Sequence, residues 1–254
     1  MFSDGEAYEH FMGRWSRRLA PRFVEFAGVR EGELLLDVGS GTGVLALAAA
    51  AAIPSVRVTG VEPSPGYVRY ARQHAGDRVH FQMGDAGALP FADDAFDRTL
   101  SMLVLNFLPN PAGALRQMVR VTRPSGVVAA AVWDYGDGME MLRTFWDTAV
   151  ALDPAAEARD ERHMPLSTRG ALADLWRTHG LRGVDEDGLT IDTTFASFDD
   201  YWQPFLSGQG PAGGYVSSLS ETAREALRIG LREQTAGAGL AMRARAWAVR
   251  GVVA

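Results

Sequence analysis

Three observations predict an α/β fold with a doubly wound, mostly parallel sheet. Short apolar segments alternate with segments of helical period in the first half of the chain, which is the pattern of strand–helix units joined by right-handed crossovers. A glycine-rich turn lies between the first apolar segment and the first of these helices. The length of 254 residues and the apolar share of 47% are enough for one such domain with a modest insertion.

The core strands are predicted from apolar runs, which are typical of strands covered on both faces. They occupy residues 34–38, 56–62, 79–83, a segment that ends near Ser101, and residues 127–133. With their helices they make five predicted strand–helix units. Such a sheet gathers the carboxyl ends of its strands at one edge, where ligands bind at the switch point.

The composition excludes several classes of function. The 31 acidic and 25 basic side chains give a net charge of −6, so no nucleic acid and no anionic membrane is expected as a partner. The absence of cysteine excludes disulfides and thiolate catalysis, and no metal site is predicted. No signal peptide pattern and no spanning apolar run is found in the sequence. We therefore expect a cytoplasmic monomer or homodimer.

The glycine turn follows the strand Leu34–Val38 and precedes a helix predicted over residues 44–52. The motif reads Asp37-x-Gly39-x-Gly41-x-Gly43. Its glycines allow positive φ and a close approach of ligand to backbone, and the helix begins with its N–H groups directed at that ligand. A dinucleotide fingerprint requires glycine where Val44 stands, and the phosphate-loop pattern lacks its Gly-Lys-Ser/Thr.

This motif resembles the first motif of the class I S-adenosylmethionine-dependent methyltransferases. Within that class the chain resembles the small-molecule branch that includes the methyltransferases of ubiquinone and menaquinone biosynthesis. The resemblance implies a Rossmann-like sheet of seven strands with an antiparallel last strand. It also implies S-adenosyl-L-methionine as cofactor, S-adenosyl-L-homocysteine as product, and a small-molecule O, N or C nucleophile as methyl acceptor. The implied cofactor contacts of the turn are Asp37, Gly39, Ser40, Gly41, Thr42 and Gly43.

Two acidic residues follow the next two predicted strands. Glu62 ends the second strand, where a carboxylate is able to accept both ribose hydroxyls of an adenosine, and the family uses an acid there for that purpose. The resemblance also implies that Pro63 lies beside the adenosine. Asp85 follows the third strand and corresponds to an acid that accepts from the adenine amino group, while Ala86 supplies a backbone N–H to the ring.

The end of the fourth predicted strand is expected to form another wall of the pocket, with Ser101 and Met102 as cofactor contacts by resemblance. Asn106 stands where many relatives carry histidine, which argues against a catalytic histidine there and leaves a helix cap open. No catalytic base is assigned. The candidates are His10, Asp134, Tyr135 and His163.

The segment 6–28 has aromatic residues at helical spacing. It resembles the leader that small-molecule methyltransferases fold over the cofactor, with an arginine on the methionine carboxylate. Arg14 is the candidate for that role, because a guanidinium binds both carboxylate oxygens, and Tyr8 and Met12 are placed at the sulfonium end. The alternative is a helix that only packs on the edge of the domain.

One domain, 1–254, is predicted, with distinct parts. These are the leader helix 6–28, the cofactor-binding core 34–133, helical substrate or lid insertions at 134–180 and 195–243, and the last strand 246–253, antiparallel beside a strand over 184–191. The glycines at 208, 210, 213 and 214 are interpreted as a flexible break in a lid, which favours a small, partly apolar acceptor. The alternative for this insertion is an oligomer contact.

Three other functions stay open at this point. One is a methyltransferase acting on protein or tRNA, although the acidic composition argues against it. The second is a regulator that binds S-adenosylmethionine without catalysis. The third is a nicotinamide oxidoreductase, which predicts binding of NAD.

Overall fold

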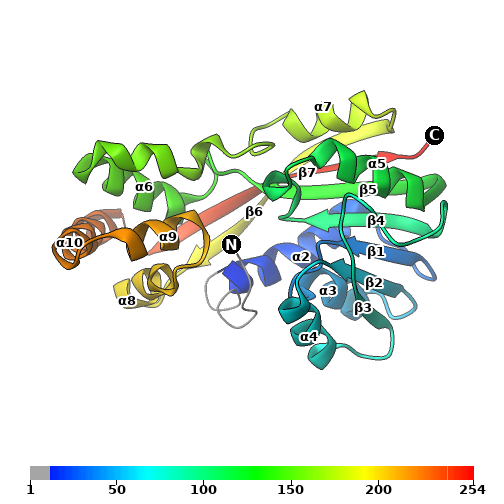
Figure 1. Ribbon diagram of the computed structural model, residues 1–254, viewed down its shortest axis with the longest axis horizontal. Helices are drawn as coiled ribbons and strands as arrows, with labels where there is room; N and C mark the ends of the chain where they lie inside the picture. Colours follow the sequence, from blue (N-terminus) through cyan, green and yellow to red (C-terminus); the bar gives the residue numbers. More distant parts are fainter. Residues whose placement is uncertain (1–11, 239) are drawn as a thin grey trace.

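A seven-stranded mixed sheet forms the centre of the computed structural model, which describes residues 12–238 and 240–254 (Figure 1). The strand order is β3-β2-β1-β4-β5-β7-β6. The first five strands pair in parallel, and β7 is antiparallel to both β5 and β6. The strands are β1 (Leu34–Val38), β2 (Arg57–Glu62), β3 (Val79–Met83), β4 (Phe96–Met102), β5 (Thr122–Trp133), β6 (Arg182–Thr194) and β7 (Ala241–Val252). The predicted fold class is confirmed.

Helices cover the sheet and extend beyond one end of it. The α-helices are α2 (Arg14–Ala27), α3 (Val44–Ala52), α4 (Pro65–His74), α5 (Pro111–Val121), α6 (Glu140–Leu152), α7 (Ala171–Thr178), α8 (Phe198–Trp202), α9 (Gly210–Ser218) and α10 (Glu221–Ala238). The 3₁₀ turns are η2 (Leu105–Phe107), η3 (Pro154–Arg159), η4 (Glu161–His163) and η5 (Gln203–Ser207). In the described ranges, no helix is both long enough and apolar enough to cross a membrane.

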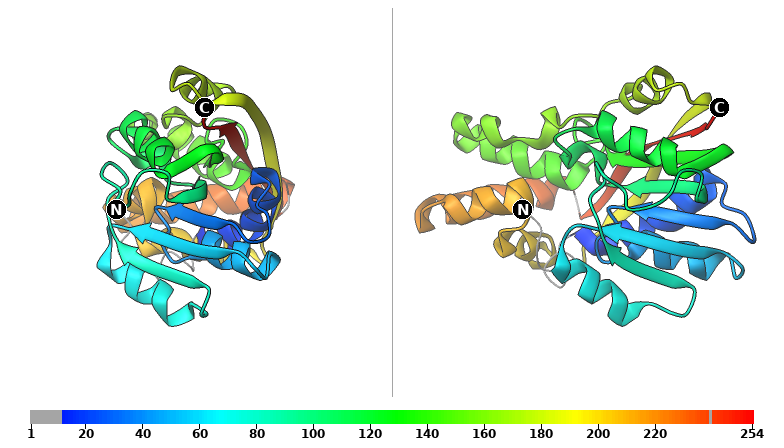
Figure 2. Two further views of the ribbon diagram at one scale, coloured as in Figure 1. Left: turned by 90° about the vertical axis from the view of Figure 1, so that its right-hand side faces the viewer. Right: turned by 45° about the vertical axis from the view of Figure 1, so that its right-hand side comes forward.

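The helices near the sheet follow the strands that they connect. Helix α3 contacts β2 and β3, as does α4, while α5 lies on β4 and β5 and α7 on β6 and β7. The helices α6, α8, α9 and α10 gather at one end of the molecule, and the right-hand view of Figure 2 shows the same separation. The arrow of β4 points toward this helical group, so the carboxyl ends of the parallel strands lie on that side.

Helix α2 packs its aromatic stripe into the domain. Trp15, Leu19 and Phe23 are at most 1% exposed, and the helix contacts α3. It ends at Gly28, whose φ of +67° lets its N–H bond back to the carbonyls of the last turn. These aromatic residues therefore belong to the hydrophobic core, as expected if the helix mainly packs on the domain.

An aromatic cluster fills the helical group. Phe145 of α6 stacks on Phe205 with ring centroids 4.5 Å apart, and Tyr215 of α9 lies edge-on to Phe145. Trp146 donates its indole N–H to Oε2 of Glu161 at 2.9 Å. Burial raises the pKa of Glu161 to about 7.

Two sequence predictions about local structure are wrong. The count of five strand–helix units is too high by one, because residues 84–95 between β3 and β4 contain no helix and form turns, with Asp94 at a φ of +59°. The predicted flexible glycine break is also wrong, because α9 includes Gly213 and Gly214. A Cβ on Gly213 would lie 2.8 Å from the backbone of Gly208, so this glycine allows close packing inside a helix.

Candidate functional site

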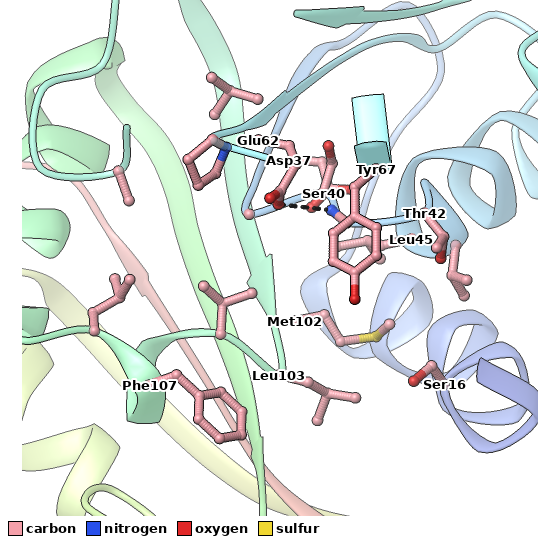
Figure 3. A pocket seen from close by; sticks show the side chains of 18 of the residues that line it. Ser16, Asp37, Ser40, Thr42, Leu45, Glu62, Tyr67, Met102, Leu103 and Phe107 are labelled. Atoms are coloured by element: carbon pink, nitrogen blue, oxygen red, sulfur yellow. Dashed lines mark hydrogen bonds between the residues drawn. The ribbon is translucent and has the colours of Figure 1, made fainter. Parts of the chain in front are cut away.

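A cavity of about 350 Å³ lies at the carboxyl ends of the parallel strands (Figure 3). This is a usual size for a small-molecule site. It brings together eleven of the residues predicted from the sequence. They are Met12, Asp37, Gly39, Ser40, Gly41, Thr42, Glu62, Pro63, Asp85, Ala86 and Met102.

The glycine turn forms one wall of the cavity. The N–H groups of Gly39 and Ser40 both donate to the carbonyl of Val61, at 2.9 and 3.0 Å. Gly39 has a φ of +73°, and a Cβ at this position would lie 2.7 Å from the side chain of Val104. Only glycine satisfies both conditions without strain. At Gly41 an added Cβ would meet nothing within 4 Å, so the backbone is open to a ligand there.

Glu62 is the acid at the end of β2. Its Oε2 accepts from the Gly41 N–H at 3.1 Å and its Oε1 from the Ser64 N–H at 2.9 Å. These bonds fix the carboxylate, which still has free acceptor positions because it offers about four in all. Burial raises the pKa of Glu62.

Asp37 lies beside Glu62 and is only 1% exposed. Burial, and to a smaller extent the nearby carboxylate of Glu62, raise its pKa to about 7. Its Oδ2 has no hydrogen-bond partner among the described residues. The group is therefore able to gain or lose a proton near neutral pH, and a cationic ligand would favour its charged form.

The third acid of the cavity is Asp85, whose Oδ1 accepts from the Gly87 N–H at 2.6 Å. Among the described lining residues, the charged side chains are the three carboxylates of Asp37, Glu62 and Asp85, and none is Lys, Arg or His. The cavity is thus suited to a ligand with positive charge.

The opposite wall comes from the segment that follows β4 and from the end of β5 with the residues just after it. It consists of Leu103, Val104, Phe107, Leu108, Trp133 and Tyr135. In Figure 3, Leu103 and Phe107 lie across the cavity from Asp37 and Glu62. The sequence predicts a wall after Ser101 and gives Tyr135 as a candidate base, but it does not single out the other side chains.

Residues from the beginnings of three helices also line the cavity. Ser16 of α2 and Tyr67 of α4 face it from two sides, and Val44 and Leu45 come from the start of α3. Ser16 stands one helical turn after Met12, so a helical projection of the leader would have identified it. The remaining lining residue, Val61, precedes Glu62 on β2.

Arg14 lies away from the lining residues. Its Nη1 donates to Oδ1 of Asp200 at 2.8 Å, and its guanidinium lies 4.3 Å from the ring centre of Trp15 and 4.7 Å from that of Phe195. This arginine therefore joins α2 to the start of α8. Tyr8 and His10 fall outside the described residues.

Two further residues predicted as cofactor contacts hold the backbone next to the cavity. Gly43 caps α3 with a φ of +89°, and a Cβ there would lie 2.6 Å from the ring of Phe81. Ser101 is fully buried, and its hydroxyl donates to the carbonyl of Val38 at 2.9 Å. Neither residue lines the cavity.

The candidates for a catalytic base are differently placed. Asp134 accepts two hydrogen bonds from Arg245, at 2.6 and 2.9 Å, and its other oxygen accepts from the Asp137 N–H. His163 is exposed on η4, whereas Tyr135 lines the cavity. The described residues contain no cluster of metal-ligating side chains.

Asn106 does not cap a helix. The cap of α5 is Asn110, whose Oδ1 accepts from the Gly113 N–H at 2.9 Å. Asn106 is 5% exposed on η2, and neither its Oδ1 nor its Nδ2 has a partner among the described residues.

The helical group supplies no described lining residue of this cavity, since every one falls between residues 12 and 135. The lid function of residues 134–180 and 195–243 stays a prediction. What the structure shows is the link between Arg14 and Asp200.

Comparison with protein families gives one match, to the methyltransferase domain model, over residues 36–130. An uncharacterized methyltransferase of Mycobacterium marinum is 45% identical over 177 residues, which cover 67% of this chain and 68% of that protein. The 2-methyl-6-phytyl-1,4-hydroquinone methyltransferase of Synechocystis is 29% identical over 214 residues, 82% of this chain and 66% of that enzyme. Several other mycobacterial relatives are matched over only 42% of their length.

Among solved structures, phosphoethanolamine N-methyltransferase 2 of Haemonchus contortus in complex with S-adenosyl-L-methionine is similar in fold. The TM-score is 0.59 at 16% identity, and the match covers 98% of this chain and 56% of that one. At this identity the likeness concerns the fold alone.

Proposed function

The chain belongs to the methyltransferase domain family, and from this membership we propose that it transfers a methyl group from S-adenosylmethionine to an O, N or C nucleophile of a small molecule. The cavity at the carboxyl ends of β1, β2 and β4 is the proposed cofactor site. The acceptor is proposed to enter on the side of Phe107, Trp133 and Tyr135, which is the part of the lining without charge.

The observation that carries this proposal is the charge of the cavity. S-adenosylmethionine has a sulfonium, an ammonium and a carboxylate, so it carries one net positive charge. The cavity presents three carboxylates and no basic side chain among its described lining residues. The dinucleotide fingerprint requires a glycine where Val44 stands, which argues against the nicotinamide alternative.

Each part of the site is assigned to a part of the cofactor. Glu62, fixed by the N–H groups of Gly41 and Ser64, is proposed to accept from the ribose hydroxyls. Asp85 and Ala86 are proposed at the adenine. The Gly39–Thr42 turn and Met12 are proposed at the methionine end. Arg14 receives no cofactor contact in this assignment, because its guanidinium is bound to Asp200.

When bound, the cofactor would supply an electrophilic methyl group, and its sulfur would keep the electron pair of the broken bond as S-adenosylhomocysteine. The protein's contribution is to bring the acceptor onto the line of the departing sulfur and to exclude water. The buried rings of Trp133 and Tyr135, at 2% and 5% exposure, provide that exclusion.

Calorimetric titration with S-adenosylhomocysteine tests the assignment. Glu62→Ala removes the acceptor of the ribose hydroxyls, and hydrogen bonds to a charged group contribute about 1.5–3 kcal/mol, so binding should weaken about 10- to 100-fold. Glu62→Gln keeps the shape and one acceptor oxygen and should weaken binding less. Glu31→Ala, an exposed acid before β1, is the matched control and should bind as the wild type does.

Two results of this titration would reject the proposal. Equal affinity of Glu62→Ala and the wild type would remove the site assignment, and binding of NAD in place of S-adenosylhomocysteine would restore the oxidoreductase alternative. Binding without methyl transfer to small molecules would leave the regulator, or an enzyme acting on protein or tRNA.

A further inference from the structure

The wall opposite the carboxylates has two features that are costly for a folded protein. Leu103 has a φ of +65°, a region that a branched, non-glycine residue rarely occupies and that costs on the order of 1–3 kcal/mol. Three residues later, Asn106 is buried with neither of its amide atoms bonded to a described residue. Both features lie in one segment, 103–108, and four of its residues line the cavity.

The strained residue is held in place by the sheet. The N–H of Leu103 donates to the carbonyl of Ala131 on β5 at 2.7 Å, so the chain leaves β4 with an abrupt change of direction. Val104 then packs against Gly39, and η2 begins. This geometry directs Phe107 and Leu103 toward the cavity (Figure 3).

The unbonded amide is unusual because buried polar groups in folded proteins nearly always have a partner. Asn110, in the next turn, shows the ordinary case, since its Oδ1 accepts from a backbone N–H. Asn106 is not itself a described lining residue, but Phe107 after it and Val104 two positions before it both line the cavity. A ligand in the cavity would reach the amide after a small rotation of η2 and would then supply the missing partner.

The chemistry of the rest of this wall limits what that ligand is. Leu103, Val104, Phe107, Leu108 and Trp133 offer only apolar or aromatic surface, apart from the indole N–H of Trp133, and Tyr135 adds a hydroxyl. The backbone N–H groups of the glycine turn are assigned to the cofactor, so a phosphate or carboxylate on the acceptor would have neither these donors nor a cation among the described lining residues. An uncharged acceptor avoids both problems.

We propose that the segment 103–108, with Trp133 and Tyr135, is the acceptor subsite, that it takes an uncharged, largely apolar molecule with a hydroxyl group, and that the Asn106 amide bonds that hydroxyl. The proposal rests on the proposed function. The amide is neither protonated nor deprotonated near neutral pH, so Asn106 orients the nucleophile and does not act as a base. Its Oδ1 accepts from the hydroxyl and its Nδ2 donates to the oxygen.

The test compares acceptors that differ in charge. Methyl 4-hydroxybenzoate and 2-methyl-1,4-naphthohydroquinone are the neutral probes, and 4-hydroxybenzoate and phosphoethanolamine are the anionic ones. The ester and the acid share one ring and one hydroxyl, so they isolate the effect of the charge. Formation of S-adenosylhomocysteine from S-adenosylmethionine is followed by mass spectrometry. We expect product with at least one neutral probe and only the no-acceptor background with both anionic probes.

The variants test Asn106 itself. Asn106→Leu has a similar size and no polar atom, so it should raise the melting temperature, leave the Kd for S-adenosylhomocysteine within about twofold, and lower kcat/KM for the neutral probe about tenfold through the lost hydrogen bond. Asn106→Ser keeps a hydroxyl and should recover part of that loss. Asn110→Ala, which removes only the helix cap, should lower the melting temperature without changing kcat/KM.

Each of the remaining experimental outcomes would reject one part of the proposal: the acceptor class, the role of Asn106 or the cofactor site. If S-adenosylhomocysteine binds but no neutral probe is methylated, or if an anionic probe is the better substrate, the acceptor class is wrong while the cofactor site stands. If Asn106→Leu is more stable and equally active, the amide is only an unsatisfied buried group. If S-adenosylhomocysteine does not bind, the proposed function fails before the acceptor is reached.

Discussion

The two walls of the cavity differ in which residues adopt a positive φ. On the side of the carboxylates, each positive φ is taken by glycine, at Gly39, Gly41 and Gly43, and Glu62 is fixed by two backbone N–H groups. On the opposite side a positive φ is taken by Leu103, and Asn106 lacks partners among the described residues. The first wall takes its backbone conformation without strain, although Asp37 in it is buried with an unpartnered oxygen. The second wall is arranged at a backbone cost that we attribute to acceptor binding.

The largest expected effect is on the free energy of unfolding, and it comes from the carboxyl group of Asp37 that is buried in the first wall. A folded-state pKa of about 7 for Asp37, against an ordinary value of 3.8, corresponds to about 4 kcal/mol of stability linked to pH. Because burial raises this pKa, the folded state keeps a proton that the unfolded state has already released. The contribution is therefore present below about pH 4 and is lost as the pH rises to 7.

Asp37→Asn should remove most of this dependence. The variant cannot lose a proton there, so its free energy of unfolding, measured by urea denaturation from pH 5 to pH 8, should fall less steeply with pH than that of the wild type. A smaller slope should persist from Glu62, whose pKa is also raised. Parallel curves for the wild type and the variant would show that Asp37 titrates normally.

The first wall was also the part that the sequence predicted well. Gly39, Glu62 and Asp85 each follow an apolar run, and parallel strands gather their carboxyl ends at one edge, so their convergence needed no coordinates. The resemblance to the class I methyltransferases is confirmed at the level of the family.

The second wall could not be predicted in the same way. Its shape depends on a positive φ at Leu103, which no propensity indicates, and on the packing of Val104 against Gly39. Arg14 shows the same difficulty at long range. Its partner Asp200 is 186 positions away in the chain, and a local motif carries no information about such a contact. Gly213 shows that glycine does not always indicate flexibility, since here it allows close packing against the backbone of Gly208.

A substitution at Gly39 tests whether glycine is what keeps the first wall relaxed. Gly39→Ala adds a Cβ 2.7 Å from Val104 at a φ of +73°, and we expect a loss of about 2–4 kcal/mol from strain and overpacking. Gly41→Ala is the matched control, because its φ is also positive, at +52°, but its Cβ would meet nothing within 4 Å. It should destabilise less.

Urea denaturation of both glycine variants measures the difference, and titration with S-adenosylhomocysteine adds a second readout. Gly41→Ala should weaken binding more than it weakens the fold, since its Cβ points into open space beside the cavity. Equal stability of the two variants would mean that Val104 moves aside freely. The first wall would then not require glycine at position 39 for packing.

The smallest expected effect is the coupling energy of the ion pair that joins α2 to the helical group. Arg14 and Asp200 form an ion pair at 2.8 Å with about a third of each side chain exposed, so solvent screening limits its contribution to about 0.5–1 kcal/mol. A double-mutant cycle with Arg14→Ala and Asp200→Asn should give a coupling energy of that size. The pair Arg177 and Asp174, at 3.0 Å and far more exposed, should give less.

The same variants determine whether this link reaches the cavity. Arg14 lies on the turn of α2 between Met12 and Ser16, which both line it. If the ion pair only joins the two parts, Asp200→Asn should change the Kd for S-adenosylhomocysteine less than about twofold. A tighter Kd would mean that the released guanidinium turns to the methionine carboxylate, and Arg14 would then regain the role that the sequence suggested.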